Sequence, residues 1–148
     1  MSKSSEIQRI PLQFAQNCVI ASIQIDLTDT VLYQFRQDLL TYLYQTKAHG
    51  LILDLSGVEV MDMIEFQALT STIAMASLMG AKTILCGFQP GVVSALVNFS
   101  VDFEQIHATL TLDNAFELME QLQQKWLQVQ PTEIELLPDI IEKKEEFL

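Results

Sequence analysis

The sequence predicts an α/β fold with a mixed, mostly parallel sheet flanked by helices. Three observations support this. Short apolar runs, typical of strands, alternate with longer segments whose apolar residues recur at helical spacing. The first two apolar runs are separated only by Gln16-Asn17, which predicts a hairpin. After the hairpin, strands and helices alternate, and this order is typical of parallel sheets with helical crossovers.

The first half of the chain predicts the hairpin, a helix and a central strand. The hairpin strands are expected over residues 10–14 and 19–25. Three capping residues then precede apolar residues at helical spacing from Val31 to Leu43, and His49-Gly50 is expected to close this helix. Residues 51–55 form an apolar run, as in a strand covered on both faces. The capping residues are Asp26, Thr28 and Asp29.

The second half repeats the alternation. A helix is expected over residues 64–79, ended by Gly80, and a strand over residues 83–86. Pro90 suits a first helical turn and opens a helix to about Phe99. A short strand over residues 106–109 then leads to a final helix that Thr111 caps, with Asp113 in its first turn. The apolar stripe of this helix is Leu112, Ala115, Phe116, Met119, Leu122 and Trp126.

Composition limits the function classes. The chain has 148 residues, a net charge of −11 and a pI near 4.3. This acidity disfavours nucleic acid and anionic membranes as partners, because both require a positive surface. It permits basic protein partners, although simple solubility explains it as well. Residues 1–9 are polar and no apolar run reaches the length of a membrane span, so the protein is expected in the cytoplasm, without membrane insertion.

The sequence contains no recognisable combination of catalytic residues. Cys18 and Cys86 each lie in an apolar run and are expected to be buried free thiols. His49 and His107 lack neighbouring ligands at metal-binding spacing, so no metal is predicted. No glycine-rich phosphate loop and no Gly-x-Ser-x-Gly element occurs, and Asp54 and Asp62, the remaining candidate pair, suit turn and cap roles. We therefore predict a protein without enzymatic activity and without a cofactor.

Two strand-to-helix corners are the candidate sites. One runs over residues 56–65 and the other over residues 87–91. Sites in α/β sheets gather where strands end and helices begin. A single helix joins the two strands that feed these corners, so we expect the strands to be neighbours and the corners to lie side by side.

The middle of the chain carries almost no charge. Between positions 64 and 101 only Glu65 and Lys82 are charged, although a half-exposed helix normally carries several charges. Two interpretations stay open: a surface that binds another protein, or a helix pair deeply buried within one domain. The neutral positions concerned are Gln67, Thr70, Ser71, Ala74, Met75, Ser77 and Leu78.

At this point the sequence resembles a known family. The elements Asp54-Leu-Ser56, Val58 and Met61-Asp62 look like the signature of STAS domains, the anti-sigma factor antagonist family. The runs Gly80-Ala-Lys82 and Gly87-Phe-Gln89-Pro90 are similar to those of bacterial stressosome scaffold proteins of the RsbS and RsbR type. The resemblance covers roughly residues 8–125.

The resemblance implies a STAS fold and a non-enzymatic role in stress signalling. Such scaffolds assemble with sister STAS proteins into a large shell, and they hold a switch protein kinase. They release it after the kinase phosphorylates a Ser or Thr that follows the Asp matching Asp62. The resemblance therefore implies a scaffold that forms homo-oligomers or hetero-assemblies.

This chain departs from the family at both phosphoacceptor positions. Met63 stands at the first and Ala95 at the second, and neither side chain can accept a phosphoryl group. Three explanations stay open: a constitutive binder, a structural member of a mixed assembly, or phosphorylation of another hydroxyl such as Ser56 or Ser94. Met63 itself suits either a partner's apolar pocket or a partly buried helix start.

The predicted partner-binding surface lies across the two corners. Two alternatives belong to other classes: an accessory subunit of a membrane transport system, in which STAS domains also occur, and a small enzyme, against which the lack of a catalytic set argues. The residues of the predicted surface are Ser56, Asp62, Met63, Ile64, Glu65, Gln89 and Pro90.

The predicted division of the chain is a STAS domain over residues 1–129 and an acidic tail over residues 130–148. The tail mixes six carboxylates with apolar residues, and Pro131 and Pro138 interrupt it. Docking on its own domain or on a neighbouring subunit, and disorder, both stay open.

Overall fold

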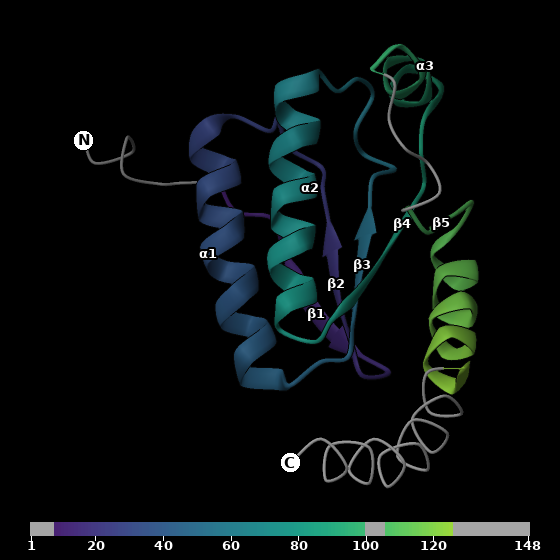
Figure 1. Cartoon of the computed structure of the whole chain (residues 1–148). Helices are drawn as coiled ribbons and strands as arrows, with labels where there is room; N and C mark the ends of the chain where they lie inside the picture. The colour runs from purple at the N-terminus through teal and green to yellow at the C-terminus, as the bar shows by residue number, and fades with distance from the viewer. Residues whose placement is uncertain (1–7, 100–105, 126–148) are drawn as a thin grey trace, which may run out of the picture. The chain divides into compact units, whose positions relative to one another are not determined.

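The computed structural model describes residues 8–99 and 106–125. The chain divides into two units after Phe116, and the sheet and the three labelled helices belong to the first unit. Within these described residues, the sheet has five strands in the order β1 (Leu12–Ala15), β2 (Cys18–Ser22), β3 (Gly50–Asp54), β4 (Lys82–Cys86) and β5 (Ala108–Thr109) (Figure 1). Only β1 is antiparallel to its neighbour, and each later strand is parallel to the one before it. The predicted mixed, mostly parallel sheet is confirmed.

The β1–β2 hairpin turns at the two predicted residues. Gln16 and Asn17 have φ angles of 54° and 63°, in the left-handed region that a two-residue hairpin turn requires. The strands are shorter than expected: β1 starts at Leu12 and β2 ends at Ser22. Ile23 continues the pairing through its N–H, which donates to the Asp54 carbonyl at 3.0 Å.

Helix α1 (Asp29–Thr46) begins as expected and ends earlier than expected. Its N-cap is Thr28, whose hydroxyl oxygen accepts a hydrogen bond from the Val31 N–H at 3.2 Å. Lys47, with a φ of 57°, closes the helix by donating its N–H to the Leu43 carbonyl. The prediction that His49-Gly50 closes the helix is therefore wrong. Gly50 instead starts β3, where it pairs with both neighbouring strands.

The remaining helices are α2 (Met63–Leu78), α3 (Pro90–Asn98) and a last helical segment over residues 112–125. Gly80, with a φ of 87°, follows the end of α2 as expected. Thr111 caps the last helix by accepting a hydrogen bond from the Asn114 N–H at 3.1 Å. Trp126, predicted in its stripe, and the boundary predicted at residue 129 lie outside the described residues. The STAS domain over residues 1–129 and the acidic tail therefore stay predictions.

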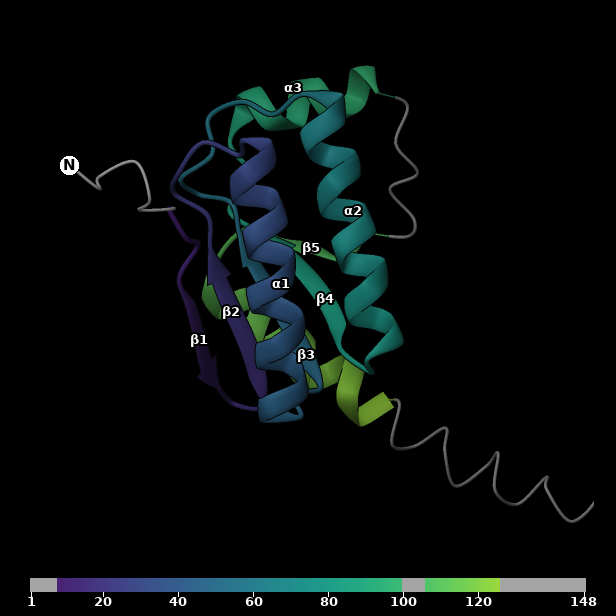
Figure 2. The ribbon, with the colours of Figure 1, turned by 90° about the vertical axis from the view of Figure 1, so that its left-hand side faces the viewer.

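The core lies between one face of the sheet and the helices α1 and α2, which lie side by side on that face (Figures 1 and 2). Phe35 and Leu39 of α1 and Leu69 of α2 are buried in it, together with Leu51 and Leu53 of β3. The opposite face of the sheet is also buried, at Ile20, Ile52 and Ile84. The continuous apolar strands therefore reflect burial on both faces.

Candidate functional site

Three loops meet at one edge of the sheet. Because β2, β3 and β4 are parallel neighbours, their carboxyl ends lie at the same edge. The loops that leave this edge cover residues 23–28, 55–62 and 87–89. The two predicted corners are therefore adjacent, as expected.

The loop after β3 begins with a tight turn. The Val58 N–H donates to the Leu55 carbonyl at 2.9 Å, and the Asp54 carboxylate accepts from the Ser56 N–H at 3.0 Å. The Asp54 side chain therefore has the turn role that the sequence predicted for it. Ser56 is exposed.

Close backbone contacts join the three loops. A Cβ built on Gly57 would lie 2.7 Å from the Ile23 carbonyl oxygen, so a larger residue would force these two loops apart. A Cβ on Gly91 would meet the Glu59 carbonyl oxygen even more closely. The Gln89 side-chain amide also donates to the Ser56 carbonyl. The edge is therefore one continuous packed surface.

The start of α2 is the centre of this surface. Asp62 is the N-cap, and its carboxylate accepts a hydrogen bond from the Glu65 N–H at 2.7 Å. Met63 is the first residue of the helix and is 44% exposed, and Ile64 is 70% exposed. The preceding Val60 is 73% exposed. Apolar side chains are thus presented to solvent beside a carboxylate.

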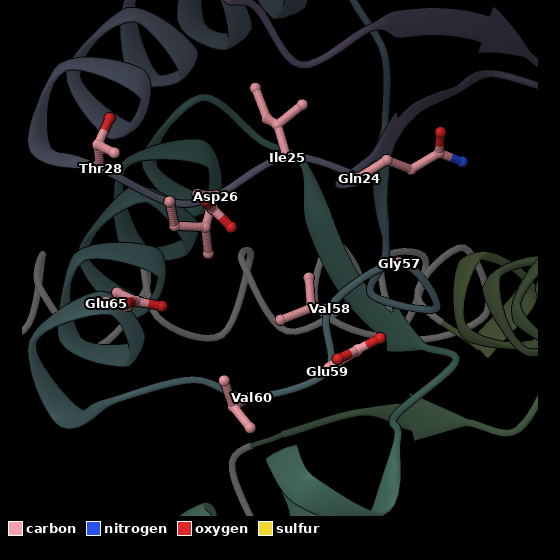
Figure 3. Close-up of a pocket in the computed structure, with 10 residues that line it drawn as sticks. Gln24, Ile25, Asp26, Thr28, Gly57, Val58, Glu59, Val60 and Glu65 are labelled. Atoms are coloured by element: carbon pink, nitrogen blue, oxygen red, sulfur yellow. The ribbon is translucent and has the colours of Figure 1, made fainter.

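An acidic pocket of about 500 Å³ lies between the loop after β2 and the loop after β3 (Figure 3). Asp26, Glu59 and Glu65 line it from three different segments, and no lining residue is Lys, Arg or His. The pKa of Glu65 is raised above its ordinary value, first by burial and then by the charge of Asp62 and a hydrogen bond with that residue. The pocket therefore carries negative potential with no basic side chain of its own to balance it.

The second predicted corner continues into α3. Pro90 occupies its first turn and is exposed, and Gln89 is half-buried. Ala95 is half-buried inside α3, and the neighbouring Ser94 is exposed. Ala95 therefore belongs to a different element from Met63.

The remaining candidate groups do not form a chemical centre. Cys18 and Cys86 are buried free thiols, and burial raises the pKa of each to about 11. His49 and His107 are both exposed. Among residues 8–99 and 106–125, no group of three or more His, Cys, Asp or Glu side chains could hold a metal ion. None of the helices in the described part of the chain has the length and apolarity needed to cross a membrane.

The neutral face of α2 is exposed. Leu78 is 89% exposed, and Thr70 and Met75 are half-buried. The inner side of the helix buries Phe66, Leu69, Thr72 and Ala76. The interpretation as a helix pair deeply buried within one domain therefore does not hold for this outer face. Its other exposed members are Gln67, Ser71, Ala74 and Ser77.

Sequence reasoning missed one loop of the site. Residues 24–28 line the acidic pocket, but Asp26 and Thr28 suggested only helix caps. The loop could have been predicted, because the loops that follow neighbouring parallel strands lie together at the carboxyl ends of those strands. That prediction would have required knowing that β2 lies beside β3.

Comparisons with known proteins agree with this geometry. A family model described as the STAS domain matches residues 9–115. A curated relative, the uncharacterized protein YezB of Bacillus subtilis, is 31% identical over 75 residues, which are 51% of this chain and 76% of YezB.

Solved structures resemble most of this chain in fold. A Ser-to-Glu variant of RsbS from Moorella thermoacetica is 24% identical with a TM-score of 0.69, covering 79% of this chain and 99% of that one. A chain in a structure described as the molecular architecture of the stressosome, a signal integration and transduction hub, is 25% identical with a TM-score of 0.68. That match covers 76% of this chain and 98% of the other.

Proposed function

Because the chain belongs to the STAS domain family, we propose that it is a non-enzymatic scaffold component of a stressosome-type assembly in the cytoplasm. It binds a switch protein kinase and sister STAS proteins, as an anti-sigma factor antagonist does in stress signalling. Phosphorylation at the usual position does not regulate it. It uses no cofactor.

The packed edge supports a binding role. Three loops held together by Gly57, Gly91 and Gln89 form a surface that needs little ordering when a partner binds. This surface combines exposed apolar side chains at Val60 and Ile64 with unbalanced carboxylates. A partner that fits it presents apolar residues beside basic ones.

Met63 is the observation that carries the proposal. It follows the N-cap Asp62 at the exposed start of α2, where a phosphoryl group would add a charge of roughly −1.5 to −2. Methionine has no acceptor oxygen, so the kinase cannot change this contact by phosphorylating it. We infer that the chain stays in the kinase-binding state, either as a constitutive binder or as a structural member of a mixed assembly.

Two hydroxyls offer a different route. Ser56 and Ser94 are both exposed, so a kinase could reach them. Neither lies at the start of α2, where an added charge would act directly on the Asp62 and Met63 surface. We therefore favour the two explanations that need no phosphorylation.

The test uses a switch protein kinase of the type that acts on stressosome scaffold proteins, taken from the same organism. Binding of the purified chain to the kinase is measured by calorimetry with and without ATP, for the wild type, Met63→Ser and Met63→Ala. We expect ATP to leave the wild type and Met63→Ala unaffected. With ATP present, the kinase should phosphorylate Met63→Ser. The phosphorylated variant should then bind the kinase about 5- to 150-fold more weakly than without ATP, the range typical of coupled sites.

Two results would contradict the proposal. One is release of the wild type by ATP with a phosphoryl group on Ser56 or Ser94, detected by mass spectrometry. The other is absence of kinase binding together with absence of any complex with sister STAS proteins.

A further inference from the structure

The methionines in the described part of the chain differ widely in exposure. Met61 is 3% exposed and Met119 is 1% exposed, and Met75 is half-buried. Met63 is 44% exposed and Met79 is 39% exposed. A thioether can be oxidised to a sulfoxide only where the oxidant reaches its sulfur, so burial protects a methionine and exposure leaves it reactive. Met63 and Met79 are therefore the methionines of α2 that a dissolved oxidant reaches most easily.

These two methionines lie at opposite ends of the same helix. Met63 is the first residue of α2, directly after the N-cap Asp62, and Met79 is the C-cap. The 16 residues of the helix separate its ends by about 24 Å, at about 1.5 Å per residue. Met63 lies at the packed edge of the sheet, whereas Met79 lies at the opposite edge, just before β4. The chain therefore holds one reactive methionine at the proposed binding surface and a similar one far from it.

Oxidation of Met63 would change the chemistry at the start of α2. The unmodified side chain is apolar and flexible, which suits an apolar pocket of a partner. A sulfoxide is polar and carries an oxygen that accepts hydrogen bonds. In solvent, water satisfies this oxygen, but inside an apolar pocket it would lack a donor, and burying an unpaired polar group costs free energy. The same side chain would therefore favour the bound state before oxidation and oppose it afterwards.

The surroundings of Met63 favour a neutral oxidant and leave the thiols out of the reaction. The carboxylates of Asp62 and Glu65 lie in the same helical turn, so they repel anions and do not repel hydrogen peroxide, which is uncharged. Cys18 and Cys86 are buried, and burial raises the pKa of each to about 11. The thiolate is the form that peroxide attacks readily, and near neutral pH these two residues hold very little of it.

We propose that Met63 is a reversible oxidation site, and that its sulfoxide weakens the contact with the switch kinase. This inference rests on the kinase-binding role proposed above. The sulfur donates an electron pair to one oxygen of hydrogen peroxide, an S–O bond forms, and the O–O bond breaks. The second oxygen leaves as water, so sulfur is oxidised by two electrons and the peroxide is reduced.

The reverse reaction uses a methionine sulfoxide reductase. A pair of thiols supplies two electrons and becomes a disulfide, the S–O bond breaks, and the oxygen leaves as water. ATP therefore leaves the kinase bound to this chain, whereas peroxide releases it and thiol reduction restores the contact.

The experiment measures binding of the full chain to the kinase by calorimetry before and after treatment with hydrogen peroxide, which catalase then removes. Peptide mass spectrometry locates each added oxygen, and we expect it on Met63 and Met79 and not on Met61. Binding should weaken by about 5- to 150-fold, the cost of one unpaired buried polar group. A methionine sulfoxide reductase with a dithiol should restore it. Kinase added before the peroxide should protect Met63 and leave Met79 reactive.

Three variants separate Met63 from the rest of the chain. Met63→Leu has no sulfur at this position, so its affinity, whatever its value, should be the same before and after peroxide. Met79→Leu is the matched control, because Met79 has nearly the same exposure on the same helix, and this variant should lose affinity as the wild type does. Met63→Gln, which is polar and uncharged, should bind as weakly as the oxidised wild type without any peroxide. Circular dichroism shows whether each protein is folded.

The outcomes distinguish this inference from the proposed function. Unchanged binding after complete oxidation of Met63 would overturn the inference alone, and so would a loss in Met63→Leu equal to that in the wild type. Oxidation of Met79 without oxidation of Met63 in the free chain would also overturn it. An untreated wild type that does not bind the kinase would overturn the proposed function, and this inference with it.

Discussion

Helices α1 and α2 lie on the same face of the sheet, but their outer sides differ. Both start at a side-chain N-cap and bury apolar residues against the sheet. The outer side of α1 contains polar residues and tyrosines, and the helix carries charges at Asp29, Arg36 and Asp38. Helix α2 carries only Glu65, and its outer side ends in the exposed Leu78. Packing against the sheet therefore covers the apolar face of α1 and leaves a polar face in solvent. Helix α2 has, in addition to its buried face, an uncharged outer face that suits contact with another protein.

The inner faces of the two helices should be equally important for stability. Phe35 of α1 is 1% exposed and Leu69 of α2 is 2% exposed. We expect Phe35→Ala to lower the free energy of unfolding by about 3–5 kcal/mol and Leu69→Ala by about 2–5 kcal/mol, because each leaves a cavity. Urea unfolding followed by circular dichroism measures both. A loss at Leu69 below about 1 kcal/mol would mean that α2 is held less firmly than α1.

The N-caps allow a finer comparison. The bond from the Glu65 N–H to Asp62 is 2.7 Å, and the bond from the Val31 N–H to Thr28 is 3.2 Å. A charged acceptor at a helix start also interacts with the helix dipole. We expect Asp62→Ala to cost about 1–2 kcal/mol and Thr28→Ala about 0.5–1 kcal/mol. Asp62→Asn, which keeps an acceptor oxygen, should recover most of the loss in the same urea experiment.

The outer faces should differ in association, with little effect on stability. Leu78→Ala and Tyr33→Ala each remove an exposed side chain, so each should change the free energy of unfolding of the dilute protein by less than about 0.5 kcal/mol. Only Leu78→Ala should weaken binding to the sister STAS proteins of the proposed assembly, measured by calorimetry, because only Leu78 lies on the uncharged outer side of α2. An equal loss of binding for both variants would remove the distinction between the two helices.

Glu65, the charged residue of α2, should make a small contribution that depends on pH. Its folded-state pKa is raised above the ordinary value of 4.5, so the folded protein binds this proton more tightly than the unfolded chain does. The resulting stability is present below the ordinary pKa and is lost as the pH rises through the raised pKa. Relative to Glu65→Gln, the wild type should therefore lose stability as the pH rises from below the ordinary pKa through the raised pKa. Glu59→Gln, at an exposed loop position, is the control, and urea unfolding at each pH is the measurement.

The comparison also explains what the sequence could predict. The spacing of Val31, Phe35 and Leu39 predicts which side of α1 is buried, because the outer side is polar. The same reasoning fails for α2, where Leu69 and Leu78 are equally apolar and only the first is buried. The residue pattern indicates that a helix face is uncharged. It does not indicate whether the sheet or another protein covers that face.

The candidate site was predictable in part for a similar reason. Asp62 and Gln89 could be found because caps and turns are local in the sequence. The part of the pocket built by Asp26 could not, because it depends on which strands are neighbours. The closing of α1 by Lys47 was missed because a lysine with positive φ has no strong sequence signal.

The order of the strands has a consequence for how the chain folds as it is made. Each strand pairs with the strand immediately before it in the sequence, from β1 to β5. No strand has to be inserted later between two strands that are already paired. The sequence separation of paired strands is therefore as short as a parallel sheet allows. The domain can therefore grow outward from the first hairpin while the ribosome is still extending the chain, with α1 and α2 covering each new strand pair in turn.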